Sequence, residues 1–460
     1  MSFTLIRKRQ RGAATLVVVM VLFFIISLVA AYTSRNLIFE QRTSANQYRS
    51  TQALEAAEAG LEWALTLLNF GRINAACTPS TSITDTSFRQ RYLNIDSNTG
   101  TVLARSITPA PTPPISAELT PQCVFDAVAS TPAWNCSCPV NGAPVLSPPS
   151  STVTAVSPAF RVRFVRIDAA SALPPAQPGV VRVEVVGCTR LDNDCLNFTG
   201  QGQTNEGRVV VSSLVALSGN MASAPVAALT ARGAVALLSG GALSVFNGAS
   251  GSLGLTVQSG GNIEFPGIVL RTTAGTPVDT SFVQNDPALN LLADAAPYTV
   301  GDRMFASVFS MFPEPFRQQQ AAIQKTCGAS GCSTGFVGTA GDLRNLIALN
   351  PGRPLWIAGS LTVDTPGDIG SATEPVLLVV NGDVQFTTAG VTIHGLVFVR
   401  KASGWATGGS GQFSGAVVSE SGVGVGAGNL SISYSGSVLN ALRGNTGTFV
   451  RVPSSWRDFQ

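Results

Sequence analysis

The feature that most constrains this chain is an apolar run near its N-terminus, which directly follows a cluster of basic residues. Residues 13–31 are apolar apart from Thr15 and Ser27. About 19 helical residues at 1.5 Å each nearly cross a bilayer core of roughly 30 Å, so the run predicts a membrane span. The basic residues predict a cytoplasmic N-terminus and a chain that continues on the other side of the membrane. They are Arg7, Lys8, Arg9 and Arg11.

The apolar run leads into a segment with the pattern of an amphipathic helix. Between Tyr32 and Phe70 there is no proline, and Gly60 is the only glycine. Apolar residues recur three and four apart and predict one buried stripe: Ala53, Ala56, Ala57, Gly60, Leu61, Ala64, Leu65 and Leu68. Polar residues occupy the other face: Glu40, Gln41, Arg42, Gln47, Arg49, Glu55, Glu58 and Glu62. We therefore expect one rod of about 58 residues and about 87 Å over residues 13–70.

Two other interpretations of this segment stay open. Val29-Ala30-Ala31 could be a signal-peptidase site, and the mature chain would then begin at Tyr32. A secretory signal usually has a shorter apolar region, of about 7–15 residues. The segment could also be an ordinary membrane anchor with a helical stalk, which explains its length but not the residues just before the span.

Those residues carry a family resemblance that extends over residues 9–66. Arg11-Gly12-Ala13 followed by an apolar run resembles the cleavage site of type IV prepilins. The string from Gln10 to Val17 resembles the PilX-type minor pilins. So do two later motifs: Glu40-x-Arg42-x3-Asn46 and the stretch Ala53-x2-Ala56-Ala57-Glu58-Ala59-Gly60-Leu61.

The resemblance implies how the N-terminus is processed. A prepilin peptidase would cut between Gly12 and Ala13 and methylate the new N-terminus at Ala13. Residues 1–12 would then be the leader, and residues 13–70 the pilin helix, with its transmembrane part at 13–32.

One position departs from the major pilins of that family. They carry glutamate at the fifth mature position, where this chain has Val17. In the family that carboxylate is thought to pair with the N-terminal amine of a neighbouring subunit, and an unpaired charge in a bilayer is costly. The departure argues against a repeating shaft subunit and favours a minor component.

Composition excludes several functional classes. The net charge is +3, charged residues make up 12%, and no long basic run follows the first dozen residues, so a nucleic-acid footprint is absent. The only histidine, His394, makes a His-based catalytic or metal site improbable. We expect no metal and no cofactor.

All eight cysteines follow the apolar run, which fits an oxidising compartment and disulfide bonds. Eight free or buried thiols are the alternative. The short loops Cys188–Cys195 and Cys327–Cys332 are the pairs we expect, and the remaining candidates have no predicted connectivity: Cys77, Cys123, Cys136 and Cys138. The spacing Cys136-x-Cys138 does not fit a zinc knuckle.

Residues 71–220 divide into two parts. Residues 71–158 are rich in Ser, Thr, Pro and Asn and predict a linker that disulfides hold together. Apolar residues then alternate with charged ones around Phe160 to Phe164 and Val181 to Val185, and a third apolar run covers Val209 to Leu217. We expect three strands of a small pilin-like sheet that packs on the helix. Asp192 and Asp194 are a weak candidate for a calcium-binding loop, and their interpretation as solvated turn residues is preferred.

Residues 221–460 are rich in glycine, and their short apolar pieces end in Gly or Asn. From Val391 to Phe413 to Leu430 the pieces recur about every twenty residues, which predicts stacked strand–turn rungs, a short parallel β-helix. A β-sandwich of hairpins is the alternative. The fold class is therefore α+β. This region also resembles the large domain of some PilX-like proteins, at residues 375–383, 393–399 and 455–459.

Residues 271–351 interrupt the rungs as a helical insertion. Asp286 and Pro287 predict the start of a helix that runs to Ala296. A helical face of three phenylalanines predicts a cover for one end of the stack: Phe305, Phe309 and Phe312. Asp342 is the expected cap of a helix that ends at Leu349.

Catalytic chemistry would need clustered carboxylates. The candidates lie in different turns near His394, with no evident shared face, so we expect no enzyme: Asp364, Asp368, Glu374 and Asp383. The resemblance implies a minor pilin in type IV pilus biogenesis, with a position at the tip as the specific hypothesis. The alternatives are a membrane-anchored adhesin with a β-solenoid and a secreted carbohydrate-active enzyme.

The resemblance also implies partners and location. The partners would be other minor and major pilins, prepilin peptidase, the inner membrane and a tip adhesin, without nucleic acid. The protein would first lie in the inner membrane with its large domain in the periplasm, and later in the pilus at the cell surface.

Overall fold

The structure is a computed structural model of the chain. It describes residues 12–96, 100–106, 118–127, 129–149, 157–167, 179–198, 207–221, 223–249, 254–292, 302–328, 331–332, 340–400 and 409–458. The basic residues before Gly12 and the Thr108–Pro114 stretch therefore lie outside it.

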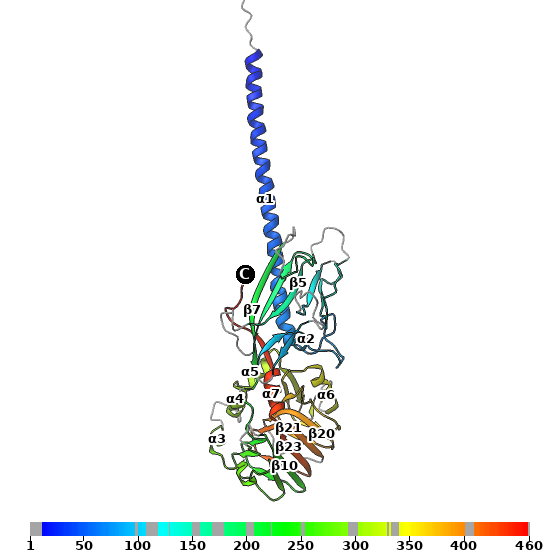
Figure 1. Ribbon diagram of the computed structural model, residues 1–460, viewed down its shortest axis with the longest axis vertical. Helices are drawn as coiled ribbons and strands as arrows, with labels where there is room; N and C mark the ends of the chain where they lie inside the picture. The colour runs from blue at the N-terminus through cyan, green and yellow to red at the C-terminus, as the bar shows by residue number, and fades with distance from the viewer. Residues whose placement is uncertain are drawn as a thin grey trace, which may run out of the picture.

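A single helix, α1 (Gly12–Leu68), forms the predicted rod and ends two residues before its predicted end at Phe70. Its 57 residues span about 85 Å. Figure 1 shows its N-terminal half projecting free and its C-terminal half lying against the body of the protein. Because no helix breaker interrupts residues 12–68, the apolar span and the amphipathic segment form one continuous element.

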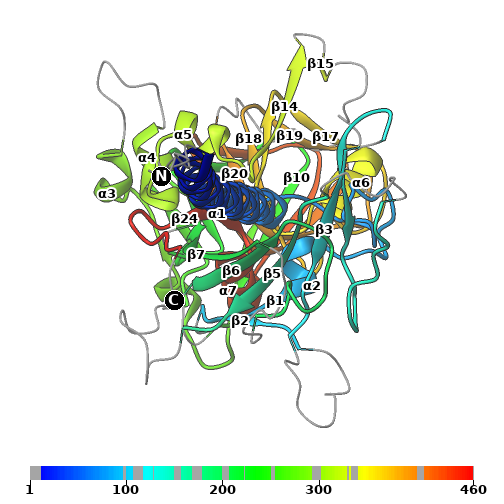
Figure 2. The ribbon, with the colours of Figure 1, turned by 90° about the horizontal axis from the view of Figure 1, so that it is seen from above.

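The C-terminal half of α1 packs on a six-stranded antiparallel sheet in the order β24-β7-β6-β5-β3-β4. Neighbouring strands of this sheet lie side by side in Figure 2. The three predicted strands are confirmed as β5 (Ala159–Val165), β6 (Val180–Cys188) and β7 (Arg208–Gly219). The predicted burial of Phe160, Val162 and Phe164 on one face is confirmed too.

The sheet is larger than the sequence predicted. Strands β3 (Gln122–Asp126) and β4 (Ala133–Ser137) extend it into the region expected to be a linker. At the opposite edge β24 (Gly447–Arg451), from the C-terminal end of the chain, pairs with β7. A helical turn, α2 (Phe88–Tyr92), and a short antiparallel pair, β1 (Leu93–Ile95) with β2 (Val102–Ala104), complete this part.

The glycine-rich region is a three-walled parallel β-helix, because its strands pair in parallel and in steps of about twenty residues. The β-sandwich alternative is therefore wrong. The first wall contains β14 (Ile323–Gly328), β16 (Leu355–Ala358), β18 (Val376–Val380), the C-terminal halves of β20 (Val391–Val399) and β21 (Ser410–Ser419), β8 (Leu229–Ala231), β11 (Val257–Ser259) and β13 (Phe282–Val283).

The other two walls follow the same stacking. The second wall contains β17 (Leu361–Val363), β19 (Val384–Phe386), β22 (Val423–Val425) and β9 (Val235–Leu237). The third wall contains the N-terminal halves of β20 and β21, then β23 (Gly428–Tyr434), β10 (Gly241–Asn247) and β12 (Ile268–Thr272). The apolar core lies between the walls.

Glycines make the corner between the third and first walls. Gly395 and Gly415 lie opposite each other in β20 and β21 and have φ angles of 143° and 142°. A Cβ on Gly415 would collide with the carbonyl of Gly395, and one on Gly395 with the carbonyl of Val376. Only glycine accepts both this φ and this close backbone stacking.

The rungs are not stacked in chain order. The chain enters in mid-stack at β8–β10 and continues to the far end through β11–β13. It then crosses the helical insertion to β14 and returns rung by rung, until β23 docks in parallel beside β10. Two segments almost 200 residues apart in the sequence therefore close the stack.

The helical insertion differs from the prediction in three respects. Asp286 does cap α3 (Pro287–Asn290), but this helix ends six residues before Ala296, with Leu291 as its C-cap. Helix α6 (Ala340–Leu349) starts before Asp342, which lies in its first turn and is not the cap. The insertion also contains η1 (Val278–Thr280) and a two-residue strand, β15 (Gly331–Cys332).

The phenylalanines cover a side of the stack and not its end. Helices α4 (Asp302–Phe309), α5 (Pro313–Gln318) and α7 (Gly436–Asn445) pack on the outer side of the first wall. Phe305 and Phe309 are buried there, whereas Phe312 precedes α5 and is 44% exposed. Leu343 of α6 joins the core between the walls.

Candidate assembly helix and its junction with the head

The projecting half of α1 is apolar and uncovered. The large apolar side chains from Leu16 to Phe39 are each more than half exposed. This helix alone, among the described residues, is long and apolar enough to cross a membrane. Such a surface is stable only in lipid or against other apolar helices. Val17, which the family resemblance singled out, is 59% exposed within it.

The polar face of the rod is confirmed. Its predicted residues from Glu40 to Glu62 are all exposed. The stripe of small residues on the other face is buried against the sheet: Ala53, Ala57 and Ala64 are fully buried, and Ala56 and Leu61 are 2% exposed. Helix α1 is thus apolar on all sides in its N-terminal part, and apolar only on the side that faces the sheet in its C-terminal part.

Glycines allow the helix and the sheet to approach closely. A Cβ on Gly60 of α1 would lie 2.7 Å from the Phe160 ring and from Val185 Cγ1. A Cβ on Gly187 of β6 would lie 2.6 Å from the Ala57 backbone nitrogen and would collide with the carbonyl of Ala53. Both distances are well below van der Waals contact, so these sites exclude any larger residue unless the helix moves.

The C-terminal end of α1 is joined to β24 through one buried amide. Asn69, 2% exposed, donates from Nδ2 to the Phe449 carbonyl at 2.8 Å and accepts the Phe449 N–H on Oδ1 at 2.7 Å. Its Nδ2 also donates to Gln320 Oε1 at 3.0 Å. A single side chain therefore couples the rod, the last strand of the sheet and the helical insertion.

Arg89 of α2 joins the sheet to the β-helix. Its guanidinium donates to four backbone carbonyls, those of Leu68, Gly352, Asn445 and Gly447. Burial, with a smaller effect of Arg353, lowers the pKa of Arg89 to about 9. The group stays charged at neutral pH, where the carbonyl dipoles compensate for its desolvation.

Neither Asn69 nor Arg89 was predicted as a functional residue. Most of their partners lie hundreds of positions away, so no local pattern marks either residue. Gly187 was also missed, because a glycine in a strand acquires meaning only when the helix opposite it is known.

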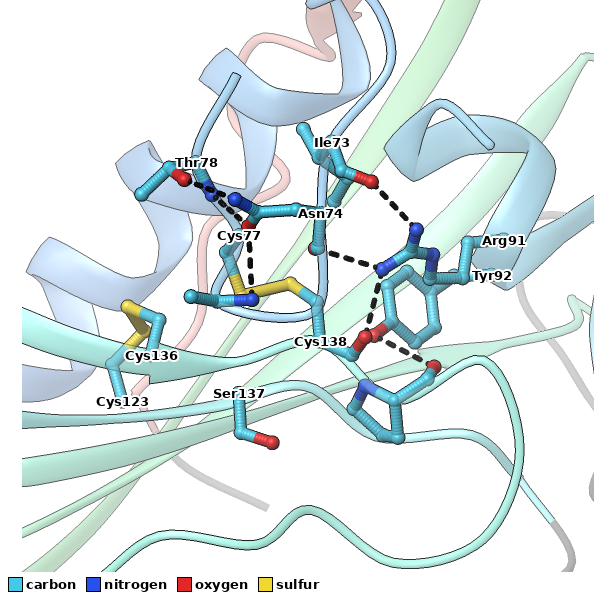
Figure 3. The surroundings of a disulfide bond; sticks show 12 residues. Ile73, Asn74, Cys77, Thr78, Arg91, Tyr92, Cys123, Cys136, Ser137 and Cys138 are labelled. Carbon is cyan, nitrogen blue, oxygen red and sulfur yellow. Dashed lines mark hydrogen bonds between the residues drawn. A yellow bond between two sulfur atoms is a disulfide. The ribbon is translucent and has the colours of Figure 1, made fainter. Parts of the chain in front are cut away.

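A cluster of disulfides and a buried arginine fastens the segment after α1 to the sheet (Figure 3). Cys77 pairs with Cys138, and Cys123 with Cys136 across β3 and β4. Arg91 donates to the carbonyls of Ile73, Asn74 and Cys138 at 2.7–3.0 Å. Burial lowers the pKa of Arg91 and raises that of Tyr92. These bonds hold the segment after α1 beside β3 and β4, in the region where the sequence predicted a linker.

The loop between β6 and β7 is closed by a disulfide between Cys188 and Cys195. Within it Asp192 Oδ1 accepts the Asp194 N–H at 2.8 Å, as expected for a turn. No metal-binding group of three His, Cys, Asp or Glu side chains exists among the described residues. The backbone places Cys327 opposite Cys332 in a hairpin, and the side chains of this pair lie outside the described part of the structure.

These pairings predict the redox state of the exported protein. We expect alkylation without reductant, followed by mass spectrometry, to leave the six cysteines of the three disulfides unmodified and Cys327 and Cys332 oxidised with each other. Each closed loop would contribute on the order of 2–4 kcal/mol to stability. Protein alkylated after reduction provides the control, and eight alkylated thiols in unreduced exported protein would contradict the prediction.

The carboxylates considered for catalysis do not form one site. Glu374 accepts from Arg72 at 2.9 Å and from Gln90 at 2.6 Å, so it belongs to the junction between the sheet and the β-helix. Asp368 Oδ2 lies 3.8 Å from His394 Nε2, so this one candidate is close to the histidine. Asp364 and Asp383 follow β17 and β18 in separate turns.

Comparisons with known proteins bear on the N-terminal helix. Residues 11–62 match the family described as PilX N-terminal. No curated protein matches the chain. A solved structure, the competence-associated pilin ComZ from Thermus thermophilus, aligns with 12% identity over 89% of this chain and 97% of its own. Its TM-score of 0.19 is too low to support a common fold.

The matched segment covers most of α1, including the beginning of the part that packs on the sheet. It begins beside the predicted cleavage junction and ends within the stripe that packs on the sheet. The N-terminal helix of this chain is therefore similar to the PilX N-terminal family over residues 11–62.

Proposed function

We propose that this protein is a minor pilin that takes part in type IV pilus biogenesis. The observation that carries the proposal is the uncovered apolar half of a PilX-type helix. Such a helix can lie in the inner membrane before assembly and pack against the helices of other pilins afterwards. Its partners would be other minor and major pilins, with prepilin peptidase as the processing enzyme.

The processing and the location follow from the same helix. The peptidase would cut between Gly12 and Ala13 and methylate Ala13. The sheet and the β-helix would lie in the periplasm and then at the cell surface. The three disulfides support a compartment outside the cytoplasm, because disulfides persist where the environment is oxidising.

We assign the protein a structural role and not a catalytic one. The segment that matches the family lies in a helix, and the candidate carboxylates are divided between a structural ion pair and separate turns. The buried polar groups near the junction, Asn69 and Arg89, bond to backbone carbonyls and amides and hold elements together.

The tip of the fibre is the position we favour. With Val17 at the fifth mature position, the subunit can offer its N-terminal amine to a following carboxylate but has no carboxylate of its own to dock on a preceding subunit. The β-helix also lies at the end of the molecule opposite the free end of α1 (Figure 1). A β-helix that extends beyond the sheet in this direction would obstruct any subunit placed ahead of this one in the fibre.

Antibody labelling tests this position. We expect gold-labelled antibody against the C-terminal domain to decorate fibre ends, with few copies per pilus. Val17→Glu should change the copy number or disturb initiation, because the new carboxylate needs a partner in an apolar layer. Val17→Leu, which stays apolar, serves as the control. Uniform labelling along the shaft together with a wild-type phenotype of Val17→Glu would refute the tip position but not the pilin assignment.

A further inference from the structure

The third wall of the β-helix has an outer face that consists mostly of uncharged polar side chains. Along its strands the side chains alternate strictly, with apolar residues such as Ile393, Phe413 and Ile432 buried in the core. The side chains between them point outward and are partly or fully exposed. In Figure 1 these strands lie side by side at the end of the molecule opposite the free end of α1.

The strand register arranges the outward side chains in two ladders that cross five strands. The first runs through Thr392, Gln412, Ser431, Ser244 and Val269. The second runs through His394, Ser414, Ser433, Phe246 and Arg271. Neighbouring strands are about 4.8 Å apart, so each ladder repeats at that distance and extends for about 19 Å.

The ladders are neutral over most of their length. Their inner positions carry hydroxyl, amide and aromatic groups, whereas ionisable side chains occur only at the two ends, in His394 and Arg271. Hydroxyl and amide groups both donate and accept hydrogen bonds. The face therefore complements a neutral ligand with many hydroxyls, and it offers little to a highly charged polymer, which needs several opposite charges.

Phe246 is the one large aromatic side chain on these ladders, and its ring is held in place. The side chain is 39% exposed, between Ser433 on one neighbouring strand and Arg271 on the other. A Cβ on Gly248 would lie 2.7 Å from Phe246 Cζ, so glycine at that position makes room for the ring. An exposed ring held in this way can stack on the apolar face of a sugar without a large loss of rotamer entropy.

We propose that the outer face of the third wall binds a neutral polysaccharide chain that runs across the strands. Its sugars would stack on Phe246 and bond to the hydroxyl and amide ladders. The regular repeat of the ladders is comparable to the length of one sugar unit in an extended glycan, which allows successive units to make equivalent contacts. This activity does not depend on the assembly of the protein into a pilus.

Binding is tested with the full chain in a zwitterionic detergent, because detergents with sugar headgroups would compete. The probes are hexasaccharides of β-1,4-linked glucose, β-1,4-linked N-acetylglucosamine and α-1,4-linked glucose, titrated by calorimetry up to millimolar concentration. We expect at least one to bind. Phe246→Ala should weaken that binding about tenfold, as expected for loss of an aromatic anchor. Gln412→Ala should weaken it too.

Two matched variants separate a local effect from a general one. Phe312 is 44% exposed on the insertion, and Gln385 points outward from the second wall. Phe312→Ala and Gln385→Ala should leave the affinity within twofold of wild type. The proposal is overturned if none of the hexasaccharides binds. It is also overturned if Phe246→Ala and Gln412→Ala bind like wild type, or if the control variants lose as much affinity as they do.

Discussion

In cells that make the Gly12→Leu variant, we expect the protein to accumulate in the membrane with its leader uncut. The resemblance to prepilins places the cut directly after Gly12, where a peptidase that requires a small residue would not accept leucine. The uncut leader keeps Arg7, Lys8, Arg9 and Arg11 on the cytoplasmic side. Each costs about 2.5–3.5 kcal/mol at the centre of a bilayer, so the subunit cannot be drawn out of the membrane into a fibre.

Intact-mass measurement of the purified protein distinguishes the uncut from the processed form, because processing removes the twelve leader residues and adds one methyl group. Gly12→Ala, which keeps a small residue, is the control and should be cut at least in part. Sheared fibre fractions should contain wild type and lack Gly12→Leu. A mature N-terminus at Ala13 in the leucine variant would contradict the pilin proposal, and one at Tyr32 in wild type would favour a secreted protein.

Gly187→Ala should lower the free energy of unfolding by about 3 kcal/mol, the upper part of the range for overpacked sites. The added Cβ would lie 2.6 Å from the Ala57 nitrogen and would collide with the Ala53 carbonyl. Both are backbone atoms of a helix, which cannot rotate away as a side chain can. The sheet and α1 must therefore separate, and Trp63, which packs on Phe160, should report the change by fluorescence.

The matched control is the same substitution in the neighbouring strand of the same sheet. The Cβ of Gly219→Ala would find its nearest atom, the Arg443 carbonyl oxygen, at an ordinary 3.8 Å. This variant should be neutral or more stable by up to about 1 kcal/mol, because alanine restricts the unfolded chain. Denaturant unfolding of both full-length variants in detergent compares them directly. Equal stability of the two variants would show that α1 is not seated as described.

Local periodicity was enough to predict α1, three strands of the sheet and the parallel rungs, but not β3, β4 or β24. The stripe from Ala53 to Leu68 predicted which face of α1 is buried, alternation predicted β5 and β6, and an apolar run predicted β7. The recurrence of apolar pieces about every twenty residues predicted parallel rungs. These properties depend on neighbours a few residues away, or on a repeat that the chain displays along its length.

The tertiary structure decided how distant segments meet. Nothing near Phe449 marks it as the edge strand that pairs with β7 and bonds to Asn69, 380 residues earlier. The pairing of β23 with β10 cannot be predicted from the sequence either, because any rung of this kind can stack on any other. What the sequence by itself determined is therefore the rod, strands β5 to β7 and the rungs. Their order in space, the closeness of α1 at Gly187 and the junction at Arg89 depended on packing between residues that share no local pattern.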